Sequence, residues 1–372
     1  MREVLFVAGE PSGDLHGAGV AAELRRAQPG IPMAGIGGAR MEAAGVTLLE
    51  HTDQLAVMGF LEVLAHIPRH WQLLAELKRR LSSGSVGLVV LIDYPGFNMK
   101  VAAAAHAAGV PVLYYITPQV WAWGAKRMTE MARTITRAAV ILPFEEAMLR
   151  GAGVNATFVG HPLLDRAHEA MPSRAEARSA LGLDERSPVL ALFPGSRRSE
   201  IERHLDAFVA TARLLEHAVP GLRVVVSVAP GITLDPVRCP YQQVAQSSFT
   251  VWRAADAALS KSGTSTLEAA VAGCPLIVAY RTSAITYGLA RRLVRIPRIG
   301  LVNVVADREV APEFVQSAAR PEAMAAALRP LLDHASPTRA AMLAGLAGVR
   351  DKLGTPGAAA RVAAIAREIA LP

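Results

Sequence analysis

The chain of 372 residues is 52% hydrophobic and 19% charged, which excludes a largely disordered protein and is long enough for two α/β domains. The formal net charge of +7 either serves solubility alone or indicates an anionic partner. The aromatic content is only 5%, and no basic run is interleaved with aromatic residues, which argues against a nucleic-acid partner. No apolar run approaches the roughly 18 residues that would cross a bilayer, and two cysteines without an export signal predict a reducing cytoplasm and no disulfides.

Strand and helix patterns alternate along the first half of the chain. The segments 16–27 and 97–109 have the apolar spacing of helices and follow strand-like runs. The continuous apolar runs that predict buried strands lie at 3–9, 87–93, 110–116, 138–144 and 156–160. Such alternation predicts a parallel sheet joined by crossover helices.

A second series of strands begins after a polar break. Residues 162–187 are charged and bounded by prolines, and they predict a linker with one short helix. The strand-like runs that follow lie at 189–195, 222–230, 257–263 and 275–280. Two such halves predict an α/β protein with two Rossmann-like, doubly wound domains facing a cleft, in which ligands bind outside the carboxyl ends of the strands.

The first strand runs into a glycine-rich turn. Gly9, Gly13 and Gly17 leave room for a ligand beside the backbone, and Asp14 and His16 place titratable groups at the start of the next helix. The spacing is not that of a dinucleotide-binding fingerprint. The turn is either functional or a tight strand–helix connection capped by Asp14.

Asp93 ends the strand at 87–93. A carboxylate in this position is partly desolvated, which raises its pKa and makes it a better base. The alternative is that Asp93 caps a helix beginning near Phe97.

Two tryptophans, Trp121 and Trp123, lie beside Lys126 and Arg127 between a strand and a helix. Tryptophan in a loop most often serves packing, but next to two cations it also suits the wall of a sugar or lipid site.

One turn in the second half has the composition of a diphosphate clamp. Gly195 and Ser196 form the turn, and Arg197 stands at the entrance of the following helix. Backbone N–H groups and a guanidinium at that point bind phosphate well. Glu200 and Glu202 are expected on the solvated face of the same helix.

A second turn, after the strand-like run at 257–263, also suits a phosphate. Lys261, Ser262, Gly263 and Thr264 precede a helix, but the glycine of a Walker loop is missing. Glu268 follows one helical turn later, within reach of sugar hydroxyls. The alternative is a helix capped by Thr264 with a solvated Glu268. Considered together with the turn at 195–197, the turn at 261–264 favours a binding site for a nucleoside diphosphate.

A series of strings in order along the chain carries a resemblance to one family. They include AGEPSGDLHGA at 8–18, GIGGARM at 35–41, PQVWAW at 118–123, PGSRRSEI at 194–201 and KSGTSTLE at 261–268. By these strings the chain resembles the lipid-A-disaccharide synthases along nearly its whole length. The resemblance implies a GT-B fold with an acceptor-side domain at 1–165, a UDP-sugar domain at 166–345 and a C-terminal helix at 346–372 that crosses back to the first domain.

The resemblance also implies a reaction. UDP-2,3-diacylglucosamine would donate its sugar to 2,3-diacylglucosamine 1-phosphate, giving a β-1,6-linked disaccharide and UDP with inversion and without metal or cofactor. Two other functions stay open. The first is a nucleotide-sugar 2-epimerase, which would need several acids and histidines around the anomeric carbon, where only Asp14, His16 and Asp93 are available. The second is a non-catalytic binding protein, and an intact Asp93 argues against it.

Site residues follow from the resemblance by position. Asp93 matches the candidate base, and Asp14 is the second candidate. The residues implied around UDP are Gly195, Ser196, Arg197, Lys261, Ser262, Gly263, Thr264, Glu268 and Asn303. Those implied on the acceptor or lipid side are Glu10, Ser12, Gly13, His16, Asn98 and Trp121. The chain departs from the family at Gly96, Gly124 and Val302, where Asp, Arg and Pro are usual.

Acylated substrates would bring the enzyme to a membrane surface. Residues 58–74 and 281–303 combine apolar with basic side chains, which suits an anionic inner membrane; alternatively they are buried helix faces with solvated arginines. The candidate docking residues are Phe60, Trp71, Arg291, Arg292 and Arg295. We expect a cytoplasmic, peripherally bound monomer or homodimer without a nucleic-acid partner.

Overall fold

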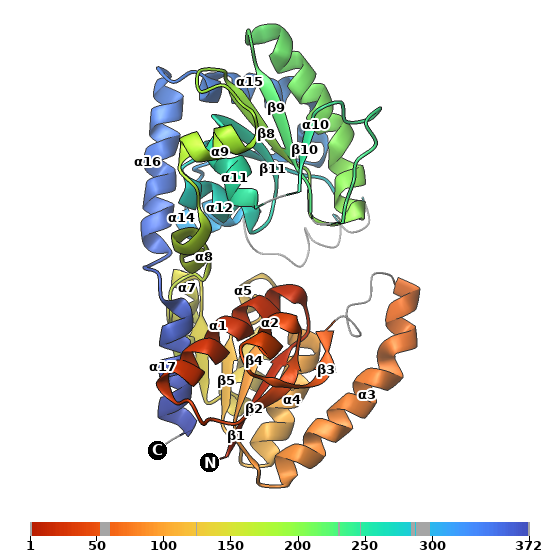
Figure 1. Ribbon diagram of the computed structural model, residues 1–372, viewed down its shortest axis with the longest axis vertical. Coiled ribbons are helices and arrows are strands. Elements are labelled where there is room, and N and C mark those ends of the chain that lie inside the picture. The colour runs from red at the N-terminus through yellow and green to blue at the C-terminus, as the bar shows by residue number, and fades with distance from the viewer. Residues whose placement is uncertain are drawn as a thin grey trace. The chain divides into compact units, whose positions relative to one another are not determined.

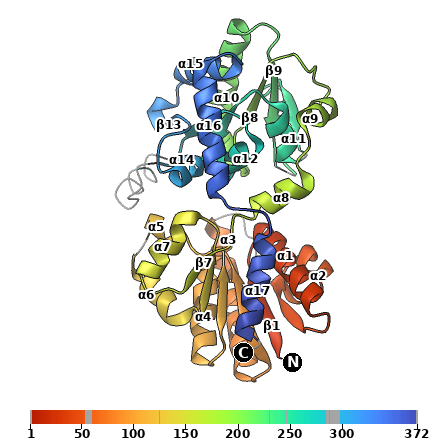
Figure 2. The ribbon, with the colours of Figure 1, turned by 90° about the vertical axis from the view of Figure 1, so that its left-hand side faces the viewer.

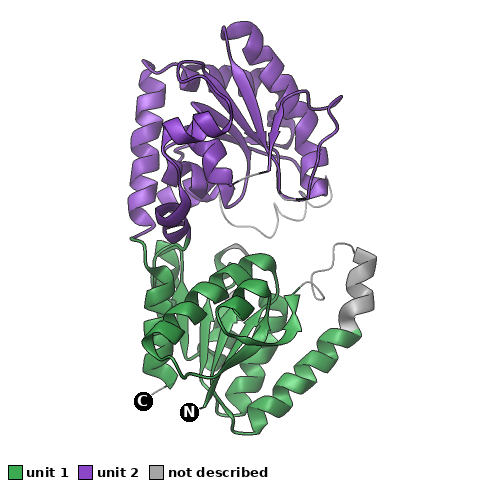
Figure 3. Cartoon of the chain, in the orientation of Figure 1, with its two compact units in different colours: residues 1–162, 355–372 green, residues 163–354 purple. Residues whose placement is uncertain are grey.

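The structure is a computed structural model that describes residues 2–52, 60–123, 125–229, 231–245, 247–283, 287 and 298–370, without the side chains at 60–67, 122, 123, 125 and 126 (Figure 1). The chain divides into two compact units (Figure 3). Unit 1 contains residues 1–162 and 355–372, and unit 2 contains residues 163–354. The breaks therefore follow Pro162 and Gly354, whereas the sequence places them after residues 165 and 345.

Unit 1 is built on a seven-stranded parallel sheet with the strand order β3-β2-β1-β4-β5-β6-β7. Its elements are β1 (Glu3–Ala8), α1 (Pro11–Ala27), β2 (Met33–Gly37), α2 (Ala39–Ala43), β3 (Thr47–His51), α3 (Phe60–Ser82), β4 (Val86–Ile92), α4 (Pro95–Ala107), β5 (Val112–Tyr115), α5 (Val120–Trp123), α6 (Ala125–Thr134), β6 (Arg137–Val140), α7 (Pro143–Gly151), β7 (Ala156–Phe158) and α17 (Ala358–Ala370). The order reverses between β1 and β4, which makes this pair the topological switch point of the sheet.

The two faces of this sheet bury alternate residues of the same strands. In β1, Val4 and Phe6 pack with apolar residues of α1 and α17, while Leu5 and Val7 pack with those of α3 and α4. A strand covered on both faces needs apolar residues at every position, which explains the continuous apolar runs in the sequence. Helix α17 lies beside α1 and contributes buried residues such as Val362, so the C-terminal helix belongs to the core of unit 1 (Figure 2).

Unit 2 is built on a six-stranded parallel sheet with the order β10-β9-β8-β11-β12-β13. Its elements are α8 (Leu163–Ala170), α9 (Arg174–Ala180), β8 (Val189–Phe193), α10 (Arg198–Ala218), β9 (Arg223–Ser227), β10 (Gln242–Val244), α11 (Ser248–Ala254), β11 (Ala257–Lys261), α12 (Ser265–Ala272), β12 (Leu276–Tyr280), α14 (Leu301–Ala306), β13 (Glu313–Val315), the 3-10 helix η2 (Gln316–Ala318), α15 (Pro321–Leu332) and α16 (Pro337–Lys352). Its switch point lies between β8 and β11.

The prediction of a linker with one short helix at 162–187 is wrong in its linker part, because the segment forms two helices of unit 2. This segment forms α8 and α9, and α9 packs on α11 inside unit 2. The charged residues of this segment predict a solvated linker, but at least one of them is buried. The Arg178 side chain is only 2% exposed and pairs with Asp256 at 2.9 Å. The segment is therefore part of the unit's folded core.

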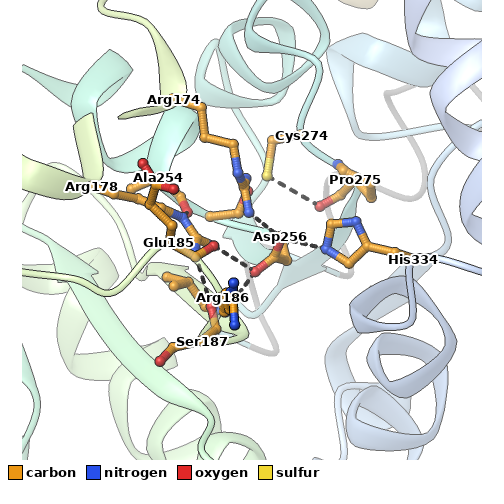
Figure 4. A network of polar contacts seen from close by, with 12 residues as sticks. Arg174, Arg178, Glu185, Arg186, Ser187, Ala254, Asp256, Cys274, Pro275 and His334 are labelled. Carbon is orange, nitrogen blue, oxygen red and sulfur yellow. Dashed lines mark hydrogen bonds and ion pairs between the residues drawn. The ribbon is translucent and has the colours of Figure 1, made fainter. Parts of the chain in front are cut away.

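Asp256 is the centre of a buried polar network (Figure 4). Its carboxylate accepts hydrogen bonds from Arg174 at 2.5 Å, Arg178 at 2.9 Å, the Val189 backbone N–H at 2.8 Å and His334 at 2.8 Å, and its carbonyl accepts one from Arg339. Burial alone would raise the pKa of Asp256, but the Val189 N–H and the two guanidiniums outweigh burial and lower this pKa. The network joins α9, the start of β8 and the helices α15 and α16 to the strand β11.

Candidate active site

In each unit the polar turns singled out in the sequence follow the two strands of the switch point. In unit 1, Ala8 at the end of β1 pairs with Ile92 at the end of β4, so the glycine-rich turn lies beside Asp93. In unit 2, Phe193 pairs with Ser260, so the turn at 194–197 lies beside the turn at 262–264. These are the places where doubly wound sheets bind their ligands.

Asp93 and Tyr94 form an unusual turn, with left-handed backbone angles (φ 48° and 50°). Such angles cost about 1–2 kcal/mol for each non-glycine residue, so the surroundings must hold them. The Asp93 carbonyl accepts hydrogen bonds from the Asn98 amide at 2.7 Å and the Tyr114 hydroxyl at 2.8 Å. Helix α4 begins at Pro95 with Tyr94 as its N-cap residue, so the alternative in which Asp93 caps this helix is wrong.

The Asp93 side chain is half-buried. Burial raises the pKa of Asp93 and the Glu10 carboxylate raises it further, against a smaller opposing effect of the Tyr94 backbone N–H. Backbone strain together with a raised carboxyl pKa is typical of functional sites. The arrangement suits Asp93 to accept a proton from a hydroxyl group.

The glycines that follow β1, Gly9 in the turn and Gly13 and Gly17 within α1, have a packing role. Each lies against a side chain of the protein itself, in the direction in which another residue would carry its Cβ. A Cβ added at Gly9, Gly13 or Gly17 would lie 2.3 Å from the Tyr94 ring, 3.1 Å from the Ala8 Cβ or 2.6 Å from the Met41 Sδ, respectively. The glycine at position 9 thus makes room for the ring of the residue that follows Asp93.

Asp14 is buried and holds the start of another helix. Its carboxylate accepts hydrogen bonds from the backbone N–H groups of Gly38 at 2.7 Å, Met41 at 3.0 Å and Arg40 at 3.2 Å, at the beginning of α2. The side chain therefore acts as a cap, supplied from α1 to a neighbouring helix. This is the capping alternative, although the helix is not the one in which Asp14 lies.

The other acceptor-side candidates divide into exposed and buried residues. Glu10 and Ser12 are exposed at the start of α1, and His16 is half-buried, with its ring in a T-shaped contact with the Tyr115 ring. Asn98 is fully buried, and its amide donates to strand-end carbonyls including that of Asp93. The Asn98 Nδ2 group therefore supports the Asp93 turn, while its buried Oδ1 has no hydrogen-bond partner among the described residues. The acceptor-side role of Asn98 stays a prediction.

Trp121 is anchored within unit 1. Its Nε1 donates to Glu145 Oε1 at 3.1 Å, and its ring packs edge-on against Phe144 at 5.5 Å. Glu145 is 3% exposed, and burial raises its pKa to about 7 against the opposing hydrogen bonds from Leu142 and Trp121. The polar end of this tryptophan is used internally, which favours the packing interpretation.

In unit 2 the turn after β8 has the expected form. Gly195 has φ 141°, which favours glycine, and a Cβ there would lie 2.7 Å from the Glu200 Cβ. Ser196 and Arg197 are exposed, and Arg197 is the N-cap residue of the long helix α10. The guanidinium and the first N–H groups of α10 are thus available to an anion.

Glu200 is not on the solvated face of α10, and that prediction is wrong. Its Oε2 accepts from the Ser196 backbone N–H at 3.1 Å, and its Oε1 pairs with Lys261 Nζ at 2.9 Å. A sequence signal existed, since Glu200 is the third residue of α10, where a carboxylate often reaches back to an N–H before the helix. The pairing with Lys261 needs the neighbouring positions of β8 and β11, which the sequence does not show.

Glu268 is held by two residues that belong to none of the motifs. Its side chain is 12% exposed; Trp252 Nε1 donates to its Oε2 at 3.1 Å, and Arg166 Nη1 lies 3.5 Å from its Oε1. Trp252 in turn stacks on Phe193 with ring centroids 3.8 Å apart. A carboxylate so bound keeps acceptor capacity for sugar hydroxyls, because each oxygen accepts more than one hydrogen bond.

The remaining candidates of unit 2 differ in availability. Thr264 is exposed at the N-cap of α12, and Gly263 beside it is half-buried. The Ser262 hydroxyl donates to the Ile299 carbonyl at 2.6 Å. Within this turn, the backbone of Gly263 and the Thr264 side chain are therefore the accessible groups.

Asn303 is buried, and its side chain is fully engaged. Its Oδ1 accepts from the N–H groups of Val310 at 2.7 Å and Ala311 at 2.9 Å, and its Nδ2 donates to the Ala311 carbonyl at 2.7 Å and to Glu313 at 2.8 Å. Four hydrogen bonds are the full capacity of an asparagine amide. The Asn303 amide therefore fixes α14 to the segment before β13, and the place of this residue near UDP stays a prediction.

The candidate docking residues are described in part. Trp71 is 60% exposed, with Lys100 Nζ 5.0 Å from the centre of its ring. The side chain of Phe60 and the residues Arg291, Arg292 and Arg295 lie outside the described residues, as does Gly124. Within the described ranges, no helix combines the length and apolar character needed to span a membrane.

Similar solved structures define the class of the fold. The glycotransferase of kitacinnamycin superposes with a TM-score of 0.66 at 16% identity, covering 100% of this chain and 99% of its own. A putative UDP-N-acetylglucosamine 2-epimerase from Listeria monocytogenes gives 0.65 at 11% identity, covering 99% and 96%. Two parallel, doubly wound units with polar turns at both switch points are the GT-B fold of nucleotide-sugar enzymes.

Sequence relatives decide between the enzymes that share this fold. The family model of lipid-A-disaccharide synthetase matches residues 4–347. A lipid-A-disaccharide synthase of Geobacter metallireducens is 43% identical over 379 residues, covering 99% of this chain and 97% of its own. The chain belongs to the lipid-A-disaccharide synthase family, and it is a UDP-sugar-dependent glycosyltransferase of lipid A biosynthesis. The epimerase alternative shares only the fold.

Proposed function

We propose that the protein transfers 2,3-diacylglucosamine from UDP-2,3-diacylglucosamine to the 6-hydroxyl of 2,3-diacylglucosamine 1-phosphate, forming the β-1,6-linked disaccharide and UDP. Family membership supports the UDP-sugar donor and the disaccharide product. The observation that carries the chemistry is the strained, half-buried Asp93 at the switch point of unit 1, with its raised pKa. It is the group best suited to activate a sugar hydroxyl.

Asp93 acts as the base in a single displacement. Its carboxylate takes the proton of the acceptor's 6-hydroxyl as that oxygen bonds to the anomeric carbon. The bond from this carbon to the diphosphate breaks, and its electron pair leaves with UDP, so the configuration inverts without a covalent intermediate or a metal. We assign the base to Asp93 over Asp14 because the Asp14 carboxylate already caps α2 through three N–H groups.

Unit 2 holds UDP and stabilises the charge that develops on it. The Gly195–Ser196 turn and Arg197 bind the diphosphate from one side, and Lys261 and the turn at 262–264 bind it from the other. Glu268, held in place by Trp252, accepts hydrogen bonds from the ribose hydroxyls.

We also propose that the acylated substrates bring the protein to the cytoplasmic face of the inner membrane. The exposed Trp71 beside Lys100, and the net charge of +7, support docking on anionic lipid. Cosedimentation with anionic vesicles tests this: Arg291→Glu should weaken binding about fivefold or more, given about 1 kcal/mol per basic residue. An equal loss in the control Arg203→Glu, on α10, would show a general charge effect and contradict docking by the 281–303 segment.

UDP release from defined substrates tests the reaction. The transferase releases UDP and forms the disaccharide when donor and acceptor are mixed, and releases none from the donor alone. Mass spectrometry of the product checks the linkage partners. UDP release that does not depend on the acceptor, or binding without any release, would contradict the proposal and favour an epimerase or a binding protein.

The diphosphate clamp gives a separate prediction. Arg197→Ala removes a charge-assisted hydrogen bond and should weaken UDP binding by about 10- to 100-fold, as measured by calorimetry. Arg203→Ala removes an exposed arginine from the same helix and serves as the control. Unchanged UDP affinity in Arg197→Ala would remove this residue from the clamp.

A further inference from the structure

The diphosphate turn of unit 2 already holds an anion, the carboxylate of Glu200. One oxygen accepts the Ser196 backbone N–H at 3.1 Å, and the other pairs with Lys261 Nζ at 2.9 Å. The side chains of Glu200 and Lys261 are 17% and 19% exposed, so the pair is largely shielded from water. The carboxylate therefore bridges the turn after β8 and the end of β11, the two strands of the switch point.

The two donors around Glu200 are groups that an incoming diphosphate would also use. A backbone N–H at the start of a long helix and a lysine ammonium together form an anion site. Burial alone would raise the pKa of Glu200, but Lys261 and the Ser196 N–H outweigh burial and lower this pKa, with the charge of Arg197 adding to them. The carboxylate is thus ionised at neutral pH and competes for these donors as a negative charge.

The position of Glu200 allows the exchange. The α-carbon of Gly195 packs against the Glu200 side chain. A Cβ at position 195 would lie 2.7 Å from the Glu200 Cβ, so a residue other than glycine would displace the Glu200 side chain. Glu200 stands in the first turn of α10, and its carboxylate reaches the turn through a flexible side chain. A rotation of that side chain would free both donors without moving the helix.

We propose that Glu200 is an exchangeable internal anion of the donor site, which holds Lys261 and the Ser196 amide in place when the site is empty and leaves them when the diphosphate binds. The inference rests on the proposed function of unit 2. Exchange replaces the ion pair of Lys261 with Glu200 by an ion pair of Lys261 with the diphosphate. The Lys261 ammonium and the Ser196 N–H, which are shielded from water, are therefore never left without an acceptor. Competition by Glu200 lowers the affinity for UDP, and thereby favours release of this product.

Calorimetric titration of UDP and of inorganic diphosphate tests the exchange. Glu200→Gln keeps the size of the side chain and removes its charge, so both ligands should bind about 5- to 30-fold more tightly, an order of magnitude expected for loss of one shielded competing charge. Glu202→Gln removes an exposed charge from the same helix and should change either affinity less than twofold. In a Lys261→Ala background, the gain from Glu200→Gln should be smaller, because only the competition for the Ser196 N–H remains.

The change in UDP affinity decides whether Glu200 leaves the two donors when the diphosphate binds. Unchanged or weaker binding of UDP in a folded Glu200→Gln protein would overturn the inference. If Glu200 instead supported Lys261 and the Ser196 amide while the ligand is bound, removing its charge would weaken the binding of UDP. Should that variant fail to fold, Glu200→Ala is titrated in its place, with tighter binding again expected. If the wild-type protein binds neither UDP nor diphosphate, the donor site proposed for unit 2 fails rather than the role of Glu200.

Discussion

At the scale of single residues, the proposed role of Asp93 as the base makes turnover depend on the ionisation of its carboxyl group. Because burial and Glu10 raise the pKa of this carboxyl, it stays protonated to a higher pH than an ordinary aspartate. The acidic limb of the pH profile of kcat/KM should therefore lie above about 4, the usual aspartate value. Glu10→Gln removes the neighbouring like charge and should move the limb to lower pH.

The matched control for this profile is Glu42→Gln, an exposed carboxylate on α2. It should leave the limb where it is in the wild-type enzyme. A limb at the ordinary aspartate value, or one that Glu10→Gln does not move, would contradict the electrostatic account of Asp93.

Asp14 makes its contribution at the scale of elements, because it joins α1 to α2. Asp14→Ala leaves three N–H groups at the start of α2 without their acceptor, which should lower the stability of unit 1 by about 1–3 kcal/mol. Turnover of the folded protein should fall less than about tenfold, below the effect of a general base. Denaturant unfolding and initial rates measure the two effects.

The comparison variant is Asp14→Asn, which keeps one acceptor oxygen and should lose less stability than Asp14→Ala. A turnover loss of Asp14→Ala beyond about a hundredfold, in a protein of wild-type stability, would move the role of the base to Asp14.

How far the elements follow from the sequence depends on where each is buried. Strands such as β1, β4 and β8 could be predicted because both faces are covered and nearly every residue is apolar, Glu3 at the start of β1 excepted. The sequence does not predict four strands: the short glycine-rich β2, and β3, β10 and β13, which are only partly buried. These strands lack the continuous apolar run that marks a buried strand.

The candidate site was predictable in part for the same reason. Asp93 and the Gly195–Arg197 turn stand at strand ends, a position that the sequence does show. The effect of Glu10 on Asp93 and the pairing of Glu200 with Lys261 depend on strands that are neighbours in the sheet but distant in the chain. A charge pattern alone therefore predicts a solvated Glu200, although this residue pairs with a partner from another strand.

At the scale of the whole molecule, two units with separate cores should respond separately to damage. Asp256→Asn breaks the network of unit 2 and leaves the buried Arg178 without its carboxylate, at a cost of about 3 kcal/mol. Hydrogen exchange should show reduced protection across 163–354 and unchanged protection in unit 1. Equal loss of protection in both units would contradict this division.

The same variant has a pH dependence with a defined sign. The pKa of Asp256 is lowered in the folded state, so its stabilising effect is present above the unfolded value of about 4 and is lost as the pH falls through the folded value. The stability difference between wild-type and Asp256→Asn should be full at pH 7 and shrink below about pH 4. A difference that stays constant down to pH 2 would show that the network does not act through the carboxylate charge.

The most direct test of the account is the separation of chemistry from donor binding in Asp93→Ala. Asp93 is proposed to act in the chemical step and not in UDP binding, so its loss should reduce kcat by about 10²- to 10⁴-fold while the calorimetric affinity for UDP stays within about twofold of wild type. Turnover that survives the substitution would contradict the account.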